Sequence, residues 1–323
     1  MKPKLLLIEN PVSGMTLGRL SAEEMSRILS SQYRVFVSIT NAKDEAEATA
    51  RSFGKDFNII AVCGGDGTLN EVLRGIMDID QEHRPALGVI PAGTSNLFAD
   101  VIGIPQGIEP ALEAICYGDL HGMDVAMMGH IPFVTAISFG CFTDTTYATP
   151  QTLKNVFGYT AYVIGAVKSL AELRSYRMKV TIGDEECMDD EFLLGAVTNV
   201  NSVGNIIKLD TGVVDYADGL FEVVFVRKPE NMTEFSSILG QIVTGRFDNE
   251  LVRFAQTDRL SIKIDEEISW TVDGEYIGDF GNLEISMKHD ALKVFVPSES
   301  MLDRFSKGML ANAASVGTGG SRS

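Results

Sequence analysis

Metal-binding and disulfide patterns are missing from this sequence of 323 residues. The four cysteines, at positions 63, 116, 141 and 187, form no CxxC pair, and the four histidines are scattered. Structural zinc sites need clustered Cys and His ligands, so none is expected. Widely spaced cysteines are typical of free thiols in a reducing compartment.

Long apolar runs and an excess of positive charge are missing as well. Residues 5–8 are too short for a signal peptide, and residues 156–167 fall short of the ~20 needed to cross a bilayer. With 44 acidic and 27 basic residues, the net charge is −17. The missing signal peptide and membrane span favour a cytoplasmic protein. Because so acidic a chain repels nucleic-acid phosphates and anionic membranes, we expect no nucleic-acid partner. Any membrane contact must come from a local basic or apolar patch.

Strand and helix patterns alternate through the first third of the chain. Helix spacing of apolar residues follows each short apolar run. One helix start carries a capping box, in which Ser21 and Glu24 can each bond to the other's backbone. The alternation predicts an α/β domain built on a doubly wound parallel sheet. Its strands are predicted at residues 5–8, 33–39, 59–62 and 87–90.

Strand patterns dominate from Gly122 onward, and helices are rare there. This pattern predicts a C-terminal antiparallel β-sandwich domain. Two helices are predicted, near residues 159–173 and 233–243. The strands are predicted at residues 123–128, 133–139, 178–182, 193–200, 220–226, 260–264, 269–272, 283–287 and 292–296.

We therefore expect two domains and a short tail. The first comprises residues 1–121, with residues of about 298–312 packing back on it. The second comprises residues 122–297. Residues 313–323 are small and rich in Gly and Ser, so they are expected to fray.

A glycine-rich loop follows the third predicted strand. Residues 64–68 read GGDGT, so bare backbone N–H groups can approach phosphate oxygens at a helix N-terminus. Asp66 would repel a phosphate unless Mg²⁺ lay between them or its carboxylate handled a proton. The loop has neither the Walker pattern nor GxGxxG, which disfavours both of those nucleotide folds. A Gly-Gly pair alone is usually a structural turn, whereas GGDGT before an amphipathic helix is far more specific.

Four motifs resemble the diacylglycerol kinase catalytic-domain family, which includes bacterial lipid kinases and sphingosine kinases. They are NPVSG at residues 10–14, GGDGTLNEV at 64–72, PAGTSN at 91–96 and DGE at 273–275. GGDGT alone is shared with NAD kinases. The other three motifs occur in the family's order and extend the resemblance over nearly the whole chain.

The three N-terminal motifs follow predicted parallel strands, at the edge where open α/β sheets bind ligands. Asn10, Ser13 and Thr94 can donate hydrogen bonds to phosphate. Asn96 either contacts the nucleotide or caps its helix. Thr40 resembles the family's nucleotide-contacting threonine. The expected nucleotide-binding residues are Asn10, Ser13, Thr40, Gly64, Gly65, Asp66, Gly67, Thr68, Gly93, Thr94 and Asn96.

Phosphoryl transfer needs a metal to neutralise charge and a group that accepts the proton of the attacking hydroxyl. The resemblance implies ATP as co-substrate and Mg²⁺ as cofactor. Asp273 is interpreted as the general base, and Asp66 as support for Mg²⁺ and nucleotide. Glu275 would share a strand face with Asp273 and could share the metal or the proton. Without the upstream motifs, DGE would be interpreted as a hairpin turn.

A second acidic segment resembles the region in which some relatives hold a structural Mg²⁺. Asp215 and Asp218 are the candidate ligands there, in addition to Asp66 at the nucleotide site. Those relatives often carry two adjacent aspartates before the glycine, and Ala217 replaces the first of them here. A solvated turn is the alternative interpretation.

The lipid side is expected near an apolar segment at residues 159–164, followed by Lys168, Arg174, Arg177 and Lys179. Such a segment suits a membrane interface. A core helix with a solvated end is slightly favoured over that interpretation, because an apolar helix face is usually part of the core. The resemblance implies diacylglycerol as acceptor and phosphatidic acid as product. A sphingoid lipid or NAD as acceptor, and a non-catalytic lipid-binding regulator, are the alternatives. The expected partners are ATP and a membrane lipid reached by peripheral contact, with a homodimer left open.

Overall fold

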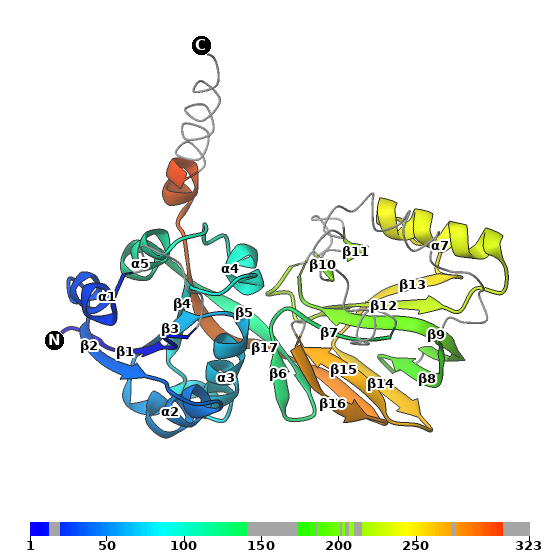
Figure 1. Cartoon of the computed structure of the whole chain (residues 1–323), viewed down its shortest axis with the longest axis horizontal. Helices are drawn as coiled ribbons and strands as arrows, with labels where there is room; N and C mark the ends of the chain where they lie inside the picture. The colour runs from blue at the N-terminus through cyan, green and yellow to red at the C-terminus, as the bar shows by residue number, and fades with distance from the viewer. Residues whose placement is uncertain are drawn as a thin grey trace, which may run out of the picture. The chain divides into compact units, whose positions relative to one another are not determined.

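The computed structural model describes residues 1–12, 20–140, 174–184, 186–200, 202–203, 207–209, 215–272 and 275–305. The chain divides into two compact units (Figure 1). The first comprises Met1–Met123 with Leu292–Ser323, and the second comprises Asp124–Ala291. The chain passes between the units twice, once within β5 and once within β17. No helix in the described ranges has the length and apolarity needed to span a bilayer.

A parallel sheet forms the centre of the first unit (Figure 1). Its strands lie in the order β4–β3–β1–β2, and the end of β17 lies parallel to β4, with Val294 opposite Leu87. The inner strands are buried on both faces, as is usual for a parallel sheet covered by helices. All four predicted strands are confirmed: β1 Lys4–Glu9, β2 Arg34–Ile39, β3 Ile59–Gly64 and β4 Ala86–Pro91.

Helices cover both faces of this sheet, with α1 and α5 on one side and α2 and α3 on the other (Figure 1). The predicted capping box of Ser21 and Glu24 is present at the start of α1. Gly75 of α3 lies against α2, where a Cβ would come within 2.5 Å of Glu47 O. The helices are α1 Ala22–Leu29, α2 Glu45–Phe53, α3 Asp66–Met77, α4 Leu97–Val101 and α5 Ile108–Tyr117, with 3₁₀ turns at Gly54–Asp56 and Gln81–His83.

Residues that follow β17 also belong to the first unit. A short helix over residues 299–305 buries Met301, and its Arg304 forms an ion pair with Glu113 of α5 at 2.7 Å. The described end of the chain is thereby attached to α5.

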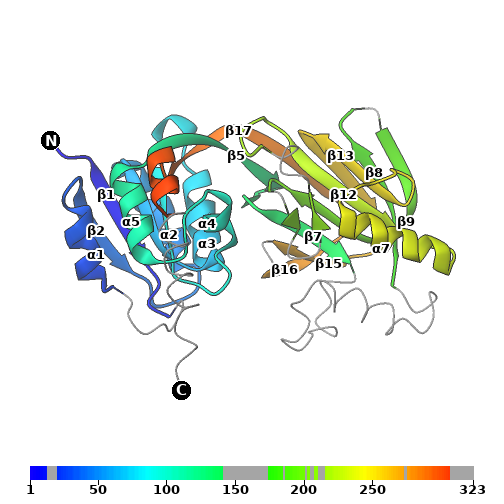
Figure 2. The same cartoon turned by 90° about the horizontal axis from the view of Figure 1, so that it is seen from above.

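Antiparallel strands form the β-sandwich of the second unit (Figure 2). The first half of β9 pairs with β8, and its second half lies between β7 and β12. The strands are β5 Asp119–Met128, β6 Ile131–Phe133, β7 Ala136–Gly140, β8 Tyr176–Ile182, β9 Glu186–Thr198, β10 Ser202–Val203, β11 Ile207–Lys208, β12 Phe221–Arg227, β13 Val252–Thr257, β14 Arg259–Ile264, β15 Ile268–Val272, β16 Glu275–Phe280 and β17 Leu283–Val296, and the helix is α7 Met232–Thr244.

Aromatic side chains fill the main core of the second unit. The ring of Phe139 lies 4.9 Å from Trp270 and 5.9 Å from Phe225, measured between ring centroids. A smaller apolar cluster lies beneath α7 and includes Ile238 and Ile242. The helix α7, which buries one face in this cluster, confirms the helix predicted near residues 233–243.

Several strand predictions for the second unit are wrong in detail. The strand predicted at residues 133–139 is two strands, because β6 pairs with β5 whereas β7 pairs with β9 and β15. The strands predicted at 283–287 and 292–296 are one strand, β17, whose exposed polar middle obscures its continuity in the sequence. Charged and polar residues likewise conceal β13 and β16, which were not predicted.

Candidate active site

Three loops leave the sheet of the first unit at the carboxyl ends of β1, β3 and β4. Because these strands are parallel neighbours, their loops share one edge of the sheet. Asn10 donates from its backbone N to Cys63 O at 2.9 Å and from Nδ2 to Thr68 Oγ1 at 3.0 Å. Ala92 N donates to Gly64 O at 2.9 Å. The structure thus brings the three N-terminal motifs together.

The loops after β3 and β4 touch through two glycines. A Cβ on Gly93 would lie 2.5 Å from Gly65 Cα, and a Cβ on Gly65 would lie 3.2 Å from Gly93 Cα. The first distance is shorter than any real carbon contact, so a side chain at Gly93 would force the loops apart. These glycines are therefore needed for packing of the chain on itself, in addition to any access that they give to a phosphate.

Asn96 closes the loop after β4. Its Oδ1 accepts from Gly93 N at 2.8 Å, and its Nδ2 donates to Gly93 O at 2.9 Å and to Gln106 Oε1 at 3.3 Å. It lies at the start of α4 with φ of 50°, and its side chain makes no capping hydrogen bond to that helix. Of the two alternatives for Asn96, the helix cap is therefore wrong, because the left-handed backbone accompanies a side chain that bonds back to the loop.

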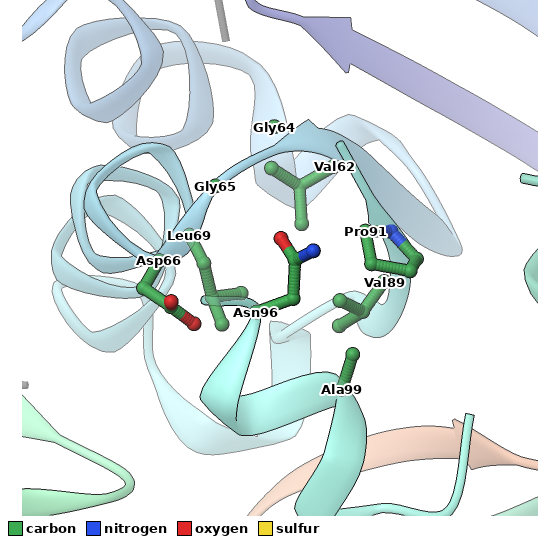
Figure 3. A pocket seen from close by; sticks show the side chains of 9 residues that line it. All are labelled: Val62, Gly64, Gly65, Asp66, Leu69, Val89, Pro91, Asn96 and Ala99. Atoms are coloured by element: carbon green, nitrogen blue, oxygen red, sulfur yellow. The ribbon is translucent and has the colours of Figure 1, made fainter. Parts of the chain in front are cut away.

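Asp66 is the first residue of α3, where a carboxylate interacts favourably with the helix dipole. Its Oδ1 accepts from Phe98 N of α4 at 3.4 Å, so it links the starts of two helices. Asp66 and Asn96 line a small pocket (Figure 3). The other lining residues are Val62, Gly64, Gly65, Leu69, Val89, Pro91 and Ala99.

Hydroxyl groups near these loops differ in exposure. Thr40 is buried, and its Oγ1 donates to Glu9 O at 3.3 Å. Thr68 is buried beside Asn10, whereas Thr94 is exposed. Of these three hydroxyls, Thr94 is therefore the one on the surface.

Two polar residues near these loops were missed by sequence reasoning. Gln106 bridges Asn96 and Asp100, with a 2.9 Å hydrogen bond to Asp100 Oδ1, and no motif marks it. Asn70 is buried, and its Oδ1 has no hydrogen-bond partner within the described parts of the chain. Asn70 lies inside the GGDGTLNEV motif, so its polarity on a buried helix face was the available signal.

The Asp215–Asp218 segment is a turn in the second unit. Asp215 Oδ1 accepts from Ala217 N at 3.0 Å, and Asp218 Oδ1 accepts from Leu220 N at 2.9 Å. Such bonds are typical of aspartates that close turns. Among the residues that the structure describes, no three His, Cys, Asp or Glu side chains form a group able to hold a metal.

Asp124 holds this turn and was not singled out from the sequence. Its carboxylate is fully buried and accepts from Gly219 N at 2.6 Å and from Asp290 N at 2.7 Å, and His289 Nδ1 lies 2.9 Å from its Oδ1. Asp290 has φ of 46°, a conformation that the bond to Asp124 helps to stabilise. The donors are remote in sequence, so no local pattern could reveal the role of Asp124.

Glu222 is a second buried carboxyl of this unit, on β12. Its Oε1 accepts from Gln256 Nε2 at 3.1 Å, and its Oε2 has no partner in the described ranges. Burial raises the pKa of Glu222 to about 7, and the nearby Asp218 adds to the effect. This carboxyl therefore changes charge near neutral pH.

Several predicted residues cannot be placed. Ser13, Asp273, residues 159–164 and Lys168 lie outside the described residues. Glu275 is the first residue of β16 and pairs with Val272 of β15.

The described cations of the proposed membrane patch already have neighbours. Arg177 Nη2 lies 2.8 Å from Asp189 Oδ1, and the Arg174 guanidinium lies 5.0 Å from the centroid of the Tyr176 ring. Arg177 and Lys179 do share the exposed face of β8. The charge of Arg177 is compensated, however, which leaves less positive charge on this face than the sequence suggests.

Comparisons with known proteins match both parts of the chain. The family model of the diacylglycerol kinase catalytic domain matches residues 4–128, and that of the YegS C-terminal NAD kinase beta sandwich-like domain matches residues 136–296. The diacylglycerol kinase of Bacillus subtilis is 30% identical over 86% of this chain and 92% of its own length. That of Staphylococcus saprophyticus is 28% identical over 93% of this chain and 97% of its own length.

Solved structures share the fold. A diacylglycerol kinase from Bacillus anthracis has a TM-score of 0.68 at 21% identity, over 91% of this chain and 97% of its own. An NAD kinase from Archaeoglobus fulgidus, solved in complex with ATP, has a TM-score of 0.52 at 12% identity, over 94% and 97%. The predicted pairing of a parallel α/β sheet with an antiparallel β-sandwich is confirmed.

Proposed function

The chain belongs to the diacylglycerol kinase family, and we propose that it transfers the γ-phosphoryl group of ATP to the hydroxyl of diacylglycerol, giving phosphatidic acid. The observation that carries this proposal is the meeting of three loops at one edge of the first unit's sheet. Asn10, Gly64 and Gly93 come from three different strand ends there. A phosphate chain needs several donors that converge from different directions, and an edge where three loops meet at a helix N-terminus suits that need.

The nucleotide would be held by backbone and hydroxyl groups of these loops. Bare N–H groups near Gly64 and Gly65 lead into the N-terminus of α3, where anions bind favourably. Thr94 is exposed and can donate to a phosphate, whereas the Asn96 amide is engaged by Gly93 and Gln106. We therefore assign Asn96 to the shape of the loop and Thr94 to direct contact.

Mg²⁺ fits the side chains of this edge. Magnesium is usually bound through one or two carboxylates together with substrate phosphates. Asp66 uses Oδ1 toward Phe98 N, which leaves Oδ2 for a cation. When bound, Mg²⁺ would neutralise charge on the transferred phosphoryl group. At the other candidate position, Asp215 and Asp218 each keep one carboxylate oxygen outside the turn, so a structural Mg²⁺ there is part of the proposal.

The acceptor side of the reaction is proposed from the DGE motif. Asp273 would take the proton of the lipid hydroxyl, and Glu275, at the start of β16, would support it or the metal. General-base catalysis requires a carboxylate within hydrogen-bond reach of that hydroxyl. The protein would work in the cytoplasm and reach its lipid by peripheral contact with the membrane.

Radiolabelled ATP tests this function directly. The purified chain is incubated with Mg²⁺ and, separately, with diacylglycerol, ceramide, sphingosine, phosphatidylglycerol and NAD. Labelled phosphatidic acid from diacylglycerol alone is the expected result. Labelled NADP, or nucleotide binding without any labelled product, would overturn the proposal in favour of an NAD kinase or a non-catalytic regulator.

Asp273→Asn tests the proposed base. The amide keeps the shape of the side chain but cannot accept the proton, so turnover should fall by ~10²–10⁴-fold while ATP affinity is retained. Asp265→Asn, at an exposed carboxylate in the turn between β14 and β15, is the matched control. Near-normal turnover in Asp273→Asn would remove Asp273 from the mechanism.

A further inference from the structure

Two hydroxyl side chains meet across strands β7 and β15, which lie side by side in the second unit (Figure 1). Ser138 lies directly opposite Thr271 in this antiparallel pair, and Ser138 Oγ is 3.0 Å from Thr271 Oγ1. Both side chains are half-buried, so each keeps part of its surface accessible. Together these two residues form a hydroxyl pair on one face of the sheet.

The hydroxyl pair has more donor capacity than its own hydrogen bonds use. Two hydroxyls carry two protons, and the bond between them engages one. Within the described ranges, the only other side-chain bond of the pair runs from Thr271 Oγ1 to Ser138 O at 3.4 Å. That distance is well beyond the range of about 2.5–3.0 Å that is usual for O–H···O bonds. One proton of the pair is therefore available to a better acceptor.

The face that carries the hydroxyl pair changes from polar to apolar across neighbouring strands. Ala196 of β9 lies directly opposite Ser138, and Val224 of β12 lies directly opposite Ala196. Because directly paired residues share a face of the sheet, the three side chains form one row. Val224 belongs to the apolar cluster beneath α7. A row with hydroxyl groups at one end and aliphatic groups at the other suits an amphipathic molecule such as a lipid.

The polar end of this row lies close to the DGE motif. Thr271 precedes Asp273 by two residues, so the length of the chain holds their Cα atoms within about 7 Å of each other. Tyr276, an exposed residue near the start of β16, is the partner of Thr271 on the other side. The hydroxyl pair is therefore within reach of a small group that is held by the proposed base.

We propose that the hydroxyl pair binds the ester carbonyl of the acceptor lipid that is adjacent to the phosphorylated hydroxyl. The inference rests on the proposed function, because the acceptor is taken to be diacylglycerol. In 1,2-diacylglycerol the free hydroxyl and the nearer ester are attached to adjacent glycerol carbons. The spare proton of the pair bonds to the carbonyl oxygen of that ester, and this bond orients the free hydroxyl toward Asp273. The acyl chains extend along the face on the side of Ala196.

A lipid without ester carbonyls tests this bond. The full chain is assayed with ATP and Mg²⁺ on a short-chain 1,2-diacylglycerol and on the dialkyl ether of the same chain length. For the wild type, kcat/KM should be about tenfold higher on the diester, because the ether leaves the donor of the pair without its acceptor.

The double variant Ser138→Ala/Thr271→Val removes both donors and keeps similar side-chain volumes. Its kcat/KM on the diester should fall about tenfold, whereas its kcat/KM on the ether should stay at the wild-type value, so the preference for the diester disappears. The KM for ATP should not change. Thr271→Ser keeps both hydroxyls and should keep the preference.

A second Ser–Thr pair in the same unit supplies the matched control. Thr181 of β8 lies directly opposite Ser261 of β14, both side chains are half-buried, and neither strand pairs with β7 or β15. Thr181→Val/Ser261→Ala removes the same atoms and should leave the preference for the diester unchanged. Urea unfolding of each double variant, followed by the fluorescence of Trp270, shows whether it is folded.

Two results would overturn the inference while leaving the proposed function intact. One is a folded Ser138→Ala/Thr271→Val variant that prefers the diester as strongly as the wild type does. The other is a wild type that uses the diester and the ether equally well. A wild type that phosphorylates neither lipid would instead refute the proposed function, and the inference with it.

Discussion

Each unit has a turn that is held by a side chain bonded to backbone groups. The two turns differ in how far along the chain that side chain lies from the groups that it bonds. In the first unit, Asn96 bonds to Gly93, three residues away. In the second, Asp124 bonds to Gly219 and Asp290, 95 and 166 residues away. A local closure forms within one segment, whereas a remote one exists only when several strands have assembled. Loss of the bonds made by Asp124 should therefore destabilise the whole second unit. Loss of the bonds made by Asn96 should affect only its own loop.

Asp124→Asn should have the largest effect on stability. The amide removes the negative charge and turns one acceptor into a donor that faces backbone N–H groups, so the free energy of unfolding of the second unit should fall by about 3 kcal/mol. The chain has one tryptophan, Trp270, which is buried in the core of that unit. Its fluorescence during urea unfolding therefore reports this unit alone.

Asp184→Asn is the control for Asp124→Asn. Asp184 belongs to the same unit, but its side chain is 72% exposed and pairs with Arg259 at the surface. Exposed ion pairs contribute about 0–1 kcal/mol, so the tryptophan transition should hardly move. If the two variants shifted the transition equally, the hydrogen bonds of Asp124 would contribute no more to stability than an exposed ion pair.

A pH series tests the second buried carboxyl of this unit. The pKa of Glu222 is about 7 in the folded chain, against an ordinary value of 4.5, because burial disfavours the charged form. The folded state thus holds the proton more tightly, and this contribution to stability is full below pH 4.5 and is lost as pH rises through 7. Glu222→Gln is neutral throughout, so at pH 8 it should be more stable than the wild type by on the order of 2 kcal/mol.

The difference between Glu222→Gln and the wild type should be small at pH 4.5 and should widen toward pH 8, as measured from the Trp270 transition. Glu284→Gln, at an exposed position of β17, is the matched control for the loss of a carboxylate. Parallel stability curves for Glu222→Gln and the wild type would mean that Glu222 does not titrate near neutral pH.

Gly93→Ala tests the local loop of the first unit. The new Cβ would lie 2.5 Å from Gly65 Cα, so the two loops must separate. If these loops bind ATP as proposed, affinity should fall by about tenfold or more, while the Trp270 transition of the other unit stays unchanged. Isothermal titration with ATP measures the first quantity. Gly240→Ala, where the Cβ would meet nothing within 4 Å, should leave ATP affinity unaltered.

Features carried by short segments were predictable from the sequence. The capping box at Ser21 and the four apolar strands of the first unit depend on neighbours within a few residues. Features that depend on distant partners were not predictable from the sequence. The contact between Gly65 and Gly93, the role of Asp124 and the continuity of β17 are set by pairings that no local pattern records.

Asn96 shows where a local pattern misleads. Asparagine before a helix usually predicts a cap, but the same side chain can bond back to its own loop when the backbone is left-handed. Both outcomes use the same residue at the same position. The sequence predicted that Asn96 either contacts the nucleotide or caps its helix, and it did not predict the bonds to Gly93.

Asn231 tests whether the expected loss of stability depends on the distance between bonded residues along the chain or only on their location in the second unit. It makes a local side-chain hydrogen bond inside that unit. Its Oδ1 accepts from Glu234 N at 3.0 Å and caps α7. Asn231→Ala should lower the free energy of unfolding by about 1 kcal/mol, well below the effect of Asp124→Asn, and Asn231→Asp should restore most of it because Asp caps equally well. The Trp270 transition in urea measures all three variants. A loss as large as that of Asp124→Asn would mean that the second unit is sensitive wherever it is altered, and distance along the chain would no longer explain the contrast between the two turns.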